Sequence, residues 1–355
     1  MNKRIPAAVA GILVLGAALG LGAGTASASG TAGALDATFG HGGIVSTDVG
    51  SPSAAALQSS GDIVIAEGNS GPGAGLVRYL PNGARDTSFG QGGFAALPDT
   101  GISSFLPHLA VQSDNKIVWA SEATSANGAG SSFDVVRFNA NGSIDTSFGT
   151  GGQVQVGNSD FTALGLDANG DIFTLSSRFE FSPTGHQDAT VTPAAITSAS
   201  HGGTSAFLPS GAFVTASTVT IIRRTDLDVQ VQRFNADGTS ASASTAFDYA
   251  GTSGLVTRDT GAAIAVQANG QAVTVGSHAE STQTTQTSVF GLARVNADGS
   301  LDAGFGNGGV LTTRIQGNDT ALVLLIQPDG KILAIGESQN AAGVTDLTLA
   351  RYLGQ

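Results

Sequence analysis

The stretch LDATFGHGG at residues 35–43 returns as RDTSFGQGG at 85–93, IDTSFGTGG at 144–152 and LDAGFGNGG at 301–309. Repeats of a few tens of residues, each too small to bury its own apolar face, are typical of solenoids, propellers and arrays. The copies span most of the 355-residue chain. We therefore expect one repetitive domain over residues 35–355 and not several unrelated ones.

Composition indicates an all-β protein. The chain has 51 glycines, and only 12% of its residues are charged. Short β-branched runs bounded by turn residues, such as GDIVIAEG at 61–68 and GKILAIGE at 330–337, predict strands joined by tight turns. There are no cysteines, so the core and not disulfides must hold the fold together.

Counting landmarks predicts six repeat units. A turn followed by a β-branched strand occurs six times, and the Asp-x-x-Phe landmark is anchored at Phe39, Phe89, Phe148, Val191, Phe247 and Phe305. The mean step of about 53 residues suits four short strands, the size of one propeller blade. The sequence thus favours six four-stranded blades, and seven remain open if residues 188–201 hide another unit.

The two ends of the chain suggest a closed ring. The last repeat stops at Arg351-Tyr352-Leu353 without its Asp-x-x-Phe-Gly segment, and the chain supplies that segment at Leu35 near its start. Termini that share one blade leave no long exposed sheet edge, whereas an open solenoid would have to cap its edges. We expect a closed β-propeller in preference to a β-solenoid.

The pattern also resembles a known family. The order L-D-x-x-F-G-x-G-G, then Q-x-D-G-K-I, then A-R-[YF]-x-x-[DN]-G is similar to the delta-60 repeat, and the likeness is strongest at residues 301–336. The resemblance implies a bacterial secreted or cell-surface β-propeller of uncharacterised function. It brings no catalytic residues to transfer.

The N-terminus predicts export. Lys3 and Arg4 precede an apolar stretch at 5–21 and the small-x-small site Ala26-Ser27-Ala28, as in a secretory signal peptide over residues 1–28 followed by a short linker at 29–34. Cleavage would leave 13 basic and 27 acidic residues, a net charge of −14. Such a charge disfavours nucleic acid and anionic lipid as partners. We expect a secreted protein, monomeric and without a membrane span after cleavage.

The repeat motif itself allows two interpretations. Its aspartates could form a ring of calcium ligands or accept backbone N–H bonds in turns; the sequence favours turns, with phenylalanines wedged between blades. Its arginines could line a channel or act as struts between blades, and the strut is favoured. The motif residues are Asp36, Asp86, Asp145, Asp302, Phe39, Phe89, Phe148, Phe305, Arg78, Arg137, Arg233, Arg294 and Arg351, with Asp188, Ser244 and Glu180 in degenerate copies.

Other residues offer weaker candidates for chemistry. Glu67, Glu122, Glu280 and Glu337 each follow a β-branched strand, and carboxylates gathered in equivalent loops could bind a cation or act in acid–base catalysis. The histidines His41, His108, His186, His201 and His278 lack zinc-site spacing, so no metal or cofactor is predicted, with calcium left open. Trp119 aligns with Ile65 and Ala334 and is expected in the core.

These observations favour a non-enzymatic extracellular scaffold that binds a protein or polysaccharide through its loops, with 186–205 and 281–288 the most idiosyncratic segments. Two alternatives stay open. One is a carbohydrate-active lyase or hydrolase using Glu67, Glu122 or Glu337. The other is a calcium-stabilised structural module.

Overall fold

The computed structural model describes residues 30–47, 50–67, 74–98, 103–124, 131–157, 164–166, 171–174, 179–182, 184–188, 204–208, 212–221, 226–250, 257–281 and 286–355. These residues form strands, turns and bends without any helix. The all-β prediction is therefore confirmed. Within this part of the chain no helix has the length and apolar composition of a membrane span. The predicted signal peptide at 1–28 lies outside the described residues.

Three sheets each contain four consecutive antiparallel strands. The first has the order β2-β3-β4-β5, the second β6-β7-β8-β9 and the third β10-β11-β12-β13. Their bounds are β2 Pro52–Leu57, β3 Ile63–Glu67, β4 Gly75–Tyr79, β5 Phe94–Ala96, β6 Ser103–Val111, β7 Ile117–Thr124, β8 Ser131–Phe138, β9 Gln153–Gly157, β10 Leu164–Leu166, β11 Ile172–Thr174, β12 Phe179–Phe181 and β13 Gln187–Asp188.

A twelve-stranded sheet holds the remaining strands, and it consists of three similar four-stranded groups. Single parallel bridges, Leu227 to Arg258 and Ser288 to Asn318, connect one group to the next. The groups are β14-β15-β16-β17, β18-β19-β20-β21 and β22-β23-β24-β1. Their bounds are β14 Thr204–Phe207, β15 Phe213–Ile221, β16 Asp226–Phe234, β17 Thr245–Phe247, β18 Thr257–Val266, β19 Ala272–Ser281, β20 Gln286–Val295, β21 Val310–Thr313, β22 Asn318–Ile326, β23 Ile332–Gln339, β24 Thr345–Tyr352 and β1 Ile44–Thr47.

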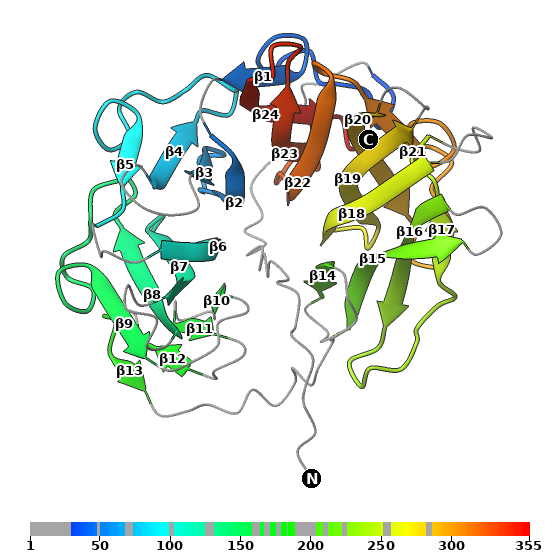
Figure 1. Ribbon diagram of the computed structural model, residues 1–355. Helices are drawn as coiled ribbons and strands as arrows, with labels where there is room; N and C mark the ends of the chain where they lie inside the picture. The colour runs from blue at the N-terminus through cyan, green and yellow to red at the C-terminus, as the bar shows by residue number, and fades with distance from the viewer. Residues whose placement is uncertain are drawn as a thin grey trace.

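These four-stranded units stand around a common centre, with the first strand of each unit innermost (Figure 1). The innermost strands β14, β18, β22, β2, β6 and β10 contact one another in that order, so the last unit of the chain lies beside the first. This arrangement is that of a β-propeller. The stretch 189–203 between β13 and β14, where the sequence left a seventh blade open, lies outside the described residues.

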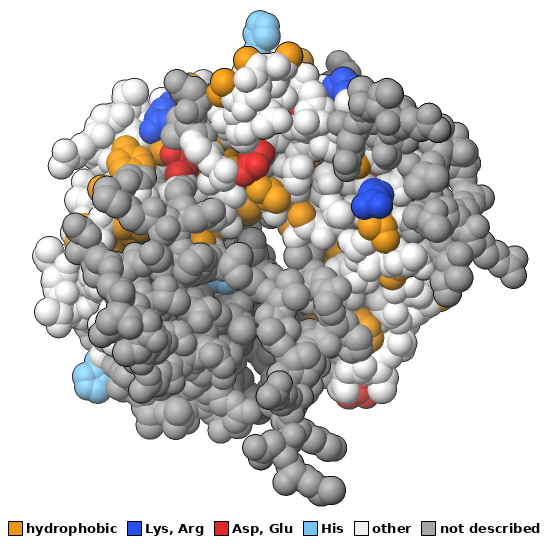
Figure 2. Space-filling model, viewed as in Figure 1, with side chains coloured by type: hydrophobic (Ala, Val, Ile, Leu, Met, Phe, Trp, Pro, Cys, Tyr) orange, Lys and Arg blue, Asp and Glu red, His pale blue; other side chains and the backbone are white. Residues whose placement is uncertain are grey.

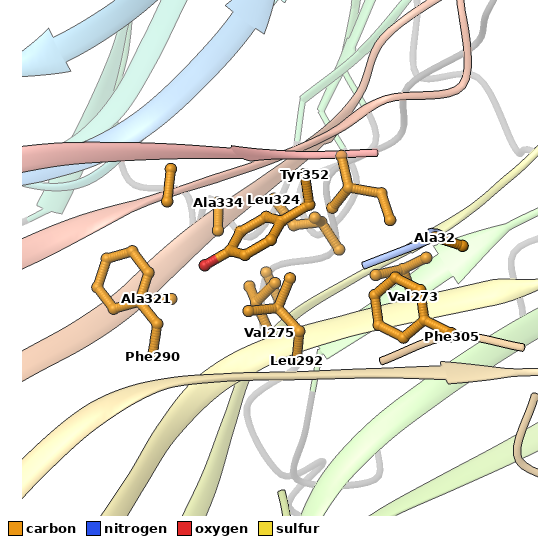
Figure 3. Close-up of a cluster of buried hydrophobic side chains, with 13 residues drawn as sticks. Ala32, Val273, Val275, Phe290, Leu292, Phe305, Ala321, Leu324, Ala334 and Tyr352 are labelled. Atoms are coloured by element: carbon orange, nitrogen blue, oxygen red, sulfur yellow. The ribbon is translucent and has the colours of Figure 1, made fainter. Parts of the chain in front are cut away.

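The apolar core lies between neighbouring units and not at the centre. One cluster joins the β18–β21 unit to the last unit through Phe290, Leu292, Phe305 and Tyr352 (Figure 3). Other clusters fill the spaces between the last and first units, the first and second, the second and third, and the β14–β17 and β18–β21 units. Alternation along each strand sends side chains to both faces, so the first, second, β18–β21 and last units each contribute described residues to two cores.

The two ends of the described chain share one unit. Strand β1 pairs antiparallel with β24, Ile44 opposite Ala350. The turn before β1 is assembled from both ends, because Gly33 donates its N–H to the Leu353 carbonyl and Leu353 donates to Ala34, both at 2.8 Å. The same two bonds close the continuous turn of the first unit, from Gly83 to Leu80 and from Leu80 to Ala84.

Residues 30–34 differ from the linker that the sequence suggested. Ala32 is buried in the cluster between the β18–β21 unit and the last unit. A side chain at Gly33 would meet the backbone of Gly306, and the Gly33 φ of 88° favours glycine. These residues thus supply the turn that β24 lacks.

Candidate functional site

The two ends of the sheets differ in how their strands are connected. At one end, which we call the turn rim, the first and second strands of every unit are joined by five residues, at 58–62, 112–116, 167–171, 208–212, 267–271 and 327–331. At the opposite end, the loop rim, connections run from four to nine residues, at 48–51, 68–74, 97–102, 125–130, 158–163, 175–178, 222–225, 248–256, 282–285, 314–317 and 340–344. Connections of equal length belong to the repeated scaffold, whereas in repeat folds the connections of variable length usually carry the residues that bind partners.

The repeat motif lies on the turn rim and is best seen in the first unit. The Nε of Arg78 donates to Asp86 Oδ2 at 2.8 Å, and the other oxygen, Oδ1, accepts the Ser88 N–H at 2.9 Å and its hydroxyl at 2.6 Å. The Arg78 guanidinium lies 4.7 Å from the centre of the buried Phe89 ring. One aspartate thus fixes the turn and holds the arginine over the ring.

Three further units repeat this geometry. Each has an arginine–aspartate ion pair below 3 Å and a guanidinium within 5 Å of the ring centre. The sets are Arg137–Asp145 at 2.8 Å with Phe148 at 4.6 Å, Arg294–Asp302 at 2.7 Å with Phe305 at 4.7 Å, and Arg351–Asp36 at 2.9 Å with Phe39 at 4.5 Å.

The same arginines also reach the next unit. Arg78 Nη1 donates to the Ala140 carbonyl of the second unit at 2.6 Å. Arg233, Arg294 and Arg351 donate to the carbonyls of Gly270, Gly354 and Pro81. Each therefore links two neighbouring units, and a guanidinium sits at the motif carboxylates where a calcium ion would have to bind.

The carboxylates are held in their charged form. Burial acts to raise the pKa of Asp145, but hydrogen bonds from Ser147 and Lys116 and the charge of Arg137 outweigh it and lower the pKa to about 2. The pKa values of Asp36, Asp86 and Asp302 are lowered by the same balance of burial against hydrogen bonds and a nearby arginine.

The β14–β17 unit departs from the motif in a way that the sequence alignment misplaced. In the regular units the motif aspartate donates its N–H to the carbonyl of the motif arginine. Here Ala241, and not Ser244, donates its N–H to the Arg233 carbonyl, so Ala241 occupies the aspartate position. The connection from β16 to β17 has ten residues, whereas three regular units have fourteen, and Phe247 lies within β17. Taking Phe247 as the motif phenylalanine and counting three residues back therefore gives Ser244, three residues after the true position. In the third unit Glu180 and Asp188 pair across β12 and β13, at the arginine and aspartate positions, and their side chains are not described.

The four glutamates do not occupy equivalent loops. All lie within strands, Glu67 in β3, Glu122 in β7, Glu280 in β19 and Glu337 in β23. Glu67 pairs with Gly75, whose equivalent in the last unit is Thr348. Glu337 pairs instead with Leu347, the residue before Thr348, so it is one position removed from the equivalent of Glu67. A one-residue offset turns a side chain to the opposite face of a strand, so these two face different neighbours. The side chains of Glu122 and Glu280 are outside the described set.

Glu67 is itself unusual. Only 4% of its surface is exposed, and its Oε1 accepts no hydrogen bond from the described residues. Burial, opposed in part by the charge of Arg85, raises its pKa to about 7. A carboxyl that stays protonated near neutrality can act as a proton donor, although its burial keeps large substrates away.

Another cluster on the loop rim was missed by sequence reasoning. Asp248 follows β17, Asp259 lies in β18 and His278 in β19, and one donor atom from each lies within 4.8 Å of the others. His278 Nδ1 is 2.7 Å from Asp259 Oδ1 and 3.5 Å from Asp248 Oδ1. The sequence analysis considered His278 alone. Aligning Asp259-Thr260 with Asp319-Thr320, which starts the next innermost strand, would have drawn attention to the aspartate.

Trp119 and His108 lie in the core, His41 and His186 are exposed, and His201 lies outside the described residues. Trp119 is 5% exposed and packs between the first and second units, which confirms its expected place in the core. His108 is also buried, and burial lowers its pKa to about 4, so its imidazole is neutral at ordinary pH. On the face shown in Figure 2, charged side chains of the described residues are few and scattered.

Sequence comparison supports a propeller family. Segments 58–89, 112–148, 279–305 and 327–354 match the family described as "Domain of unknown function (DUF5122) beta-propeller". These segments lie in the first, second, fifth and last units, the ones in which the motif is most regular. No curated protein matches this chain.

Solved structures with some likeness are distant. A protein of unknown function from Dyadobacter fermentans is 11% identical, with a TM-score of 0.47 and coverage of 88% of this chain and 100% of its own. An exo-1,5-alpha-L-arabinanase from a bovine ruminal metagenomic library is 11% identical, with a TM-score of 0.34 and coverage of 89% and 95%. The polysaccharide lyase Uly1 is 13% identical, with a TM-score of 0.35 and coverage of 85% and 90%.

Proposed function

We propose that this chain is a secreted, non-enzymatic propeller of six four-stranded blades, of the delta-60 type, closed by its own termini. Six units of four strands can be drawn from the strand pairings, and the β1–β24 pairing supports closure at the termini. Lys3, Arg4 and the apolar stretch that follows support export. N-terminal sequencing of protein recovered from the medium tests export, and a start at Ser29 is expected.

We further propose that the loop rim binds an extracellular polysaccharide or protein. The observation that supports this most is the contrast between the rims. The turn rim repeats a five-residue connection between first and second strands and carries the shared motif in its longer connections, whereas the loop-rim connections vary from four to nine residues. Val344, the exposed large apolar side chain of the described residues, lies in a loop-rim connection. The turn rim is occupied by arginines that pair with an aspartate of their own unit and donate to a carbonyl of the next, so it serves the frame.

A thermal melt of the purified protein against cell-wall glycans, other microbial and plant polysaccharides, calcium and chelator tests this proposal. The proposal predicts that one polysaccharide raises the melting temperature and is recovered unchanged. Cleavage of that polysaccharide would contradict the non-enzymatic assignment and favour the lyase or hydrolase. A shift with calcium alone would favour the structural module, and a panel without any shift would direct the search to a protein partner.

A carbohydrate-active enzyme remains the second candidate because of Glu67. Its pKa of about 7 suits a general acid, and Glu67→Gln separates the two functions. Under the scaffold proposal this variant binds the same polysaccharide as wild type. Under the enzymatic alternative it loses turnover by roughly the 10²–10⁴-fold that such a group contributes.

A further inference from the structure

We propose that Asp248, Asp259 and His278 form a binding site for a divalent transition metal, with Zn²⁺ as the best-fitting ion, at the loop rim of the β18–β21 unit. The proposal is independent of the binding function above, since neither the polysaccharide nor the protein partner enters the argument. The three residues come from two strands and the connection before them, so the fold and not local sequence brings them together.

The donor set fits zinc in kind. One imidazole nitrogen and two carboxylates are ligands that Zn²⁺ accepts, and the two negative charges would balance the ion. Calcium prefers six to eight oxygen ligands, which an imidazole does not supply. Three protein ligands leave a fourth position on the ion for water or a ligand.

The donor set also fits in size. Ligand atoms about 2.0–2.2 Å from a tetrahedral zinc ion lie about 3.3–3.6 Å apart. The Nδ1 of His278 is 2.7 Å from Asp259 and 3.5 Å from Asp248, near this spacing, and the three donor atoms all lie within 4.8 Å of one another.

The surroundings hold the ligands in position. The side chains of Asp259 and His278 are 0% and 3% exposed, while Asp248 at 15% is the one nearest to solvent. The Tyr249 N–H donates to Asp259 Oδ2 at 2.7 Å, and the hydroxyl of Thr257 donates to Asp248 Oδ2 at 3.0 Å. Asp259 is thus oriented through one oxygen while its other oxygen faces the histidine, and Asp248 is held through both, since its Oδ1, the oxygen nearer His278, also accepts the Ala250 N–H at 2.7 Å.

The neighbouring unit provides an internal comparison. There Asp319 stands where Asp259 does, and Ser338 stands opposite it in place of His278. Asp319 accepts the Ser338 hydroxyl at 2.5 Å and the N–H groups of Ile315 at 2.8 Å and Gln316 at 3.1 Å. Donors of hydrogen bonds surround that carboxylate, which suits a loop brace. In the β18–β21 unit a backbone N–H, that of Tyr249, still donates to Asp259, but a histidine replaces the serine and a second carboxylate lies beside it, which suits a cation.

Isothermal titration of the metal-free protein with ZnCl₂, with metal content measured by mass spectrometry after dialysis, tests the site. We expect one zinc per chain, and at least about a tenfold loss of affinity in each of His278→Gln and Asp248→Asn, because each removes a ligand. Ser338→Ala, at the equivalent place in the next unit, should bind zinc like wild type. Cobalt(II) provides a second readout, since its visible absorption should appear in wild type and not in His278→Gln.

Two results would overturn the proposal. One is the absence of stoichiometric zinc or cobalt binding by the wild-type protein. The other is zinc binding that His278→Gln and Asp248→Asn, both folded by their melting profiles, leave within twofold of wild type. Binding would then belong to other histidines, and the cluster would be a hydrogen-bonded brace like the one at Asp319.

Discussion

Replacing Glu67 by glutamine should change how the stability of the protein depends on pH. Glu67 is buried at the end of β3, and its pKa is raised from 4.5 to about 7 by burial, with Arg85 opposing the shift. Glutamine keeps the shape of the side chain but does not ionise.

The sign follows from proton binding. Below about pH 4.5 the carboxyl is protonated in both the folded and unfolded states. Between pH 4.5 and 7 the unfolded chain releases this proton while the folded protein keeps it, so the free energy of unfolding falls as the pH rises. Each pKa unit corresponds to about 1.4 kcal/mol, so a rise from 4.5 to about 7 gives a total loss of about 3.5 kcal/mol well above pH 7. The glutamine variant should not show this loss.

Urea unfolding at half-unit steps from pH 4 to 8.5 measures the effect as the difference between wild type and Glu67→Gln. Any constant cost of burying the amide cancels in the slope of that difference, as do the other titrating groups. Glu337→Gln, at a half-buried position in β23, is the control for removing a carboxylate near this rim. A difference that stays flat from pH 5 to 8, or in which wild type gains stability relative to the variant, would refute the reasoning.

Three predictions concern the frame. Arg137→Ala should lower the free energy of unfolding by about 3 kcal/mol, because it removes the buried partner of the Asp145 carboxylate and leaves it only Ser147 and the more exposed Lys116; urea unfolding checks this, and a loss below 1 kcal/mol would contradict it. Gly142→Ala places a Cβ 2.8 Å from the Gly90 nitrogen at a φ of 86°, whereas Gly151→Ala meets nothing within 4 Å at a φ of 66°. The first should therefore cost at least about 1 kcal/mol more than the second, and equal melting temperatures would disprove the contact. Removing residues 30–47 unpairs β24, so light scattering should show association through that edge; a stable monomer would argue against the shared unit.

Much of the repeated β-sheet framework could be predicted from the sequence, because the same motif occurs in several units of the chain. The spacing of Asp86 and Phe89 and the recurrence of Arg78 predict a turn and a charged partner that the structure brings together at 2.8 Å. Local spacing fails where an insertion or deletion intervenes. The connection before β17 is four residues shorter than in the regular units, so the alignment took Phe247 of β17 as the motif phenylalanine and placed the aspartate at Ser244 instead of Ala241.

The loop rim was much less predictable. Whether Glu67 and Glu337 face the same way depends on a one-residue register difference, which composition does not reveal. Asp248 and His278 are thirty residues apart in sequence, and only the pairing of β18 with β19 brings the cluster together. Sites that depend on three-dimensional convergence of separate segments leave no local pattern.

The central claim is that the loop rim binds while the turn rim serves the frame. Hydrogen–deuterium exchange of the purified protein, with and without the polysaccharide or protein that raises its melting temperature, tests this claim most directly. The account predicts slowed exchange in loop-rim connections such as 68–74, 282–285 and 340–344, with the five-residue turns at 58–62 and 327–331 unchanged. Protection confined to those turns and to the Asp-x-x-Phe-Gly segments would contradict it.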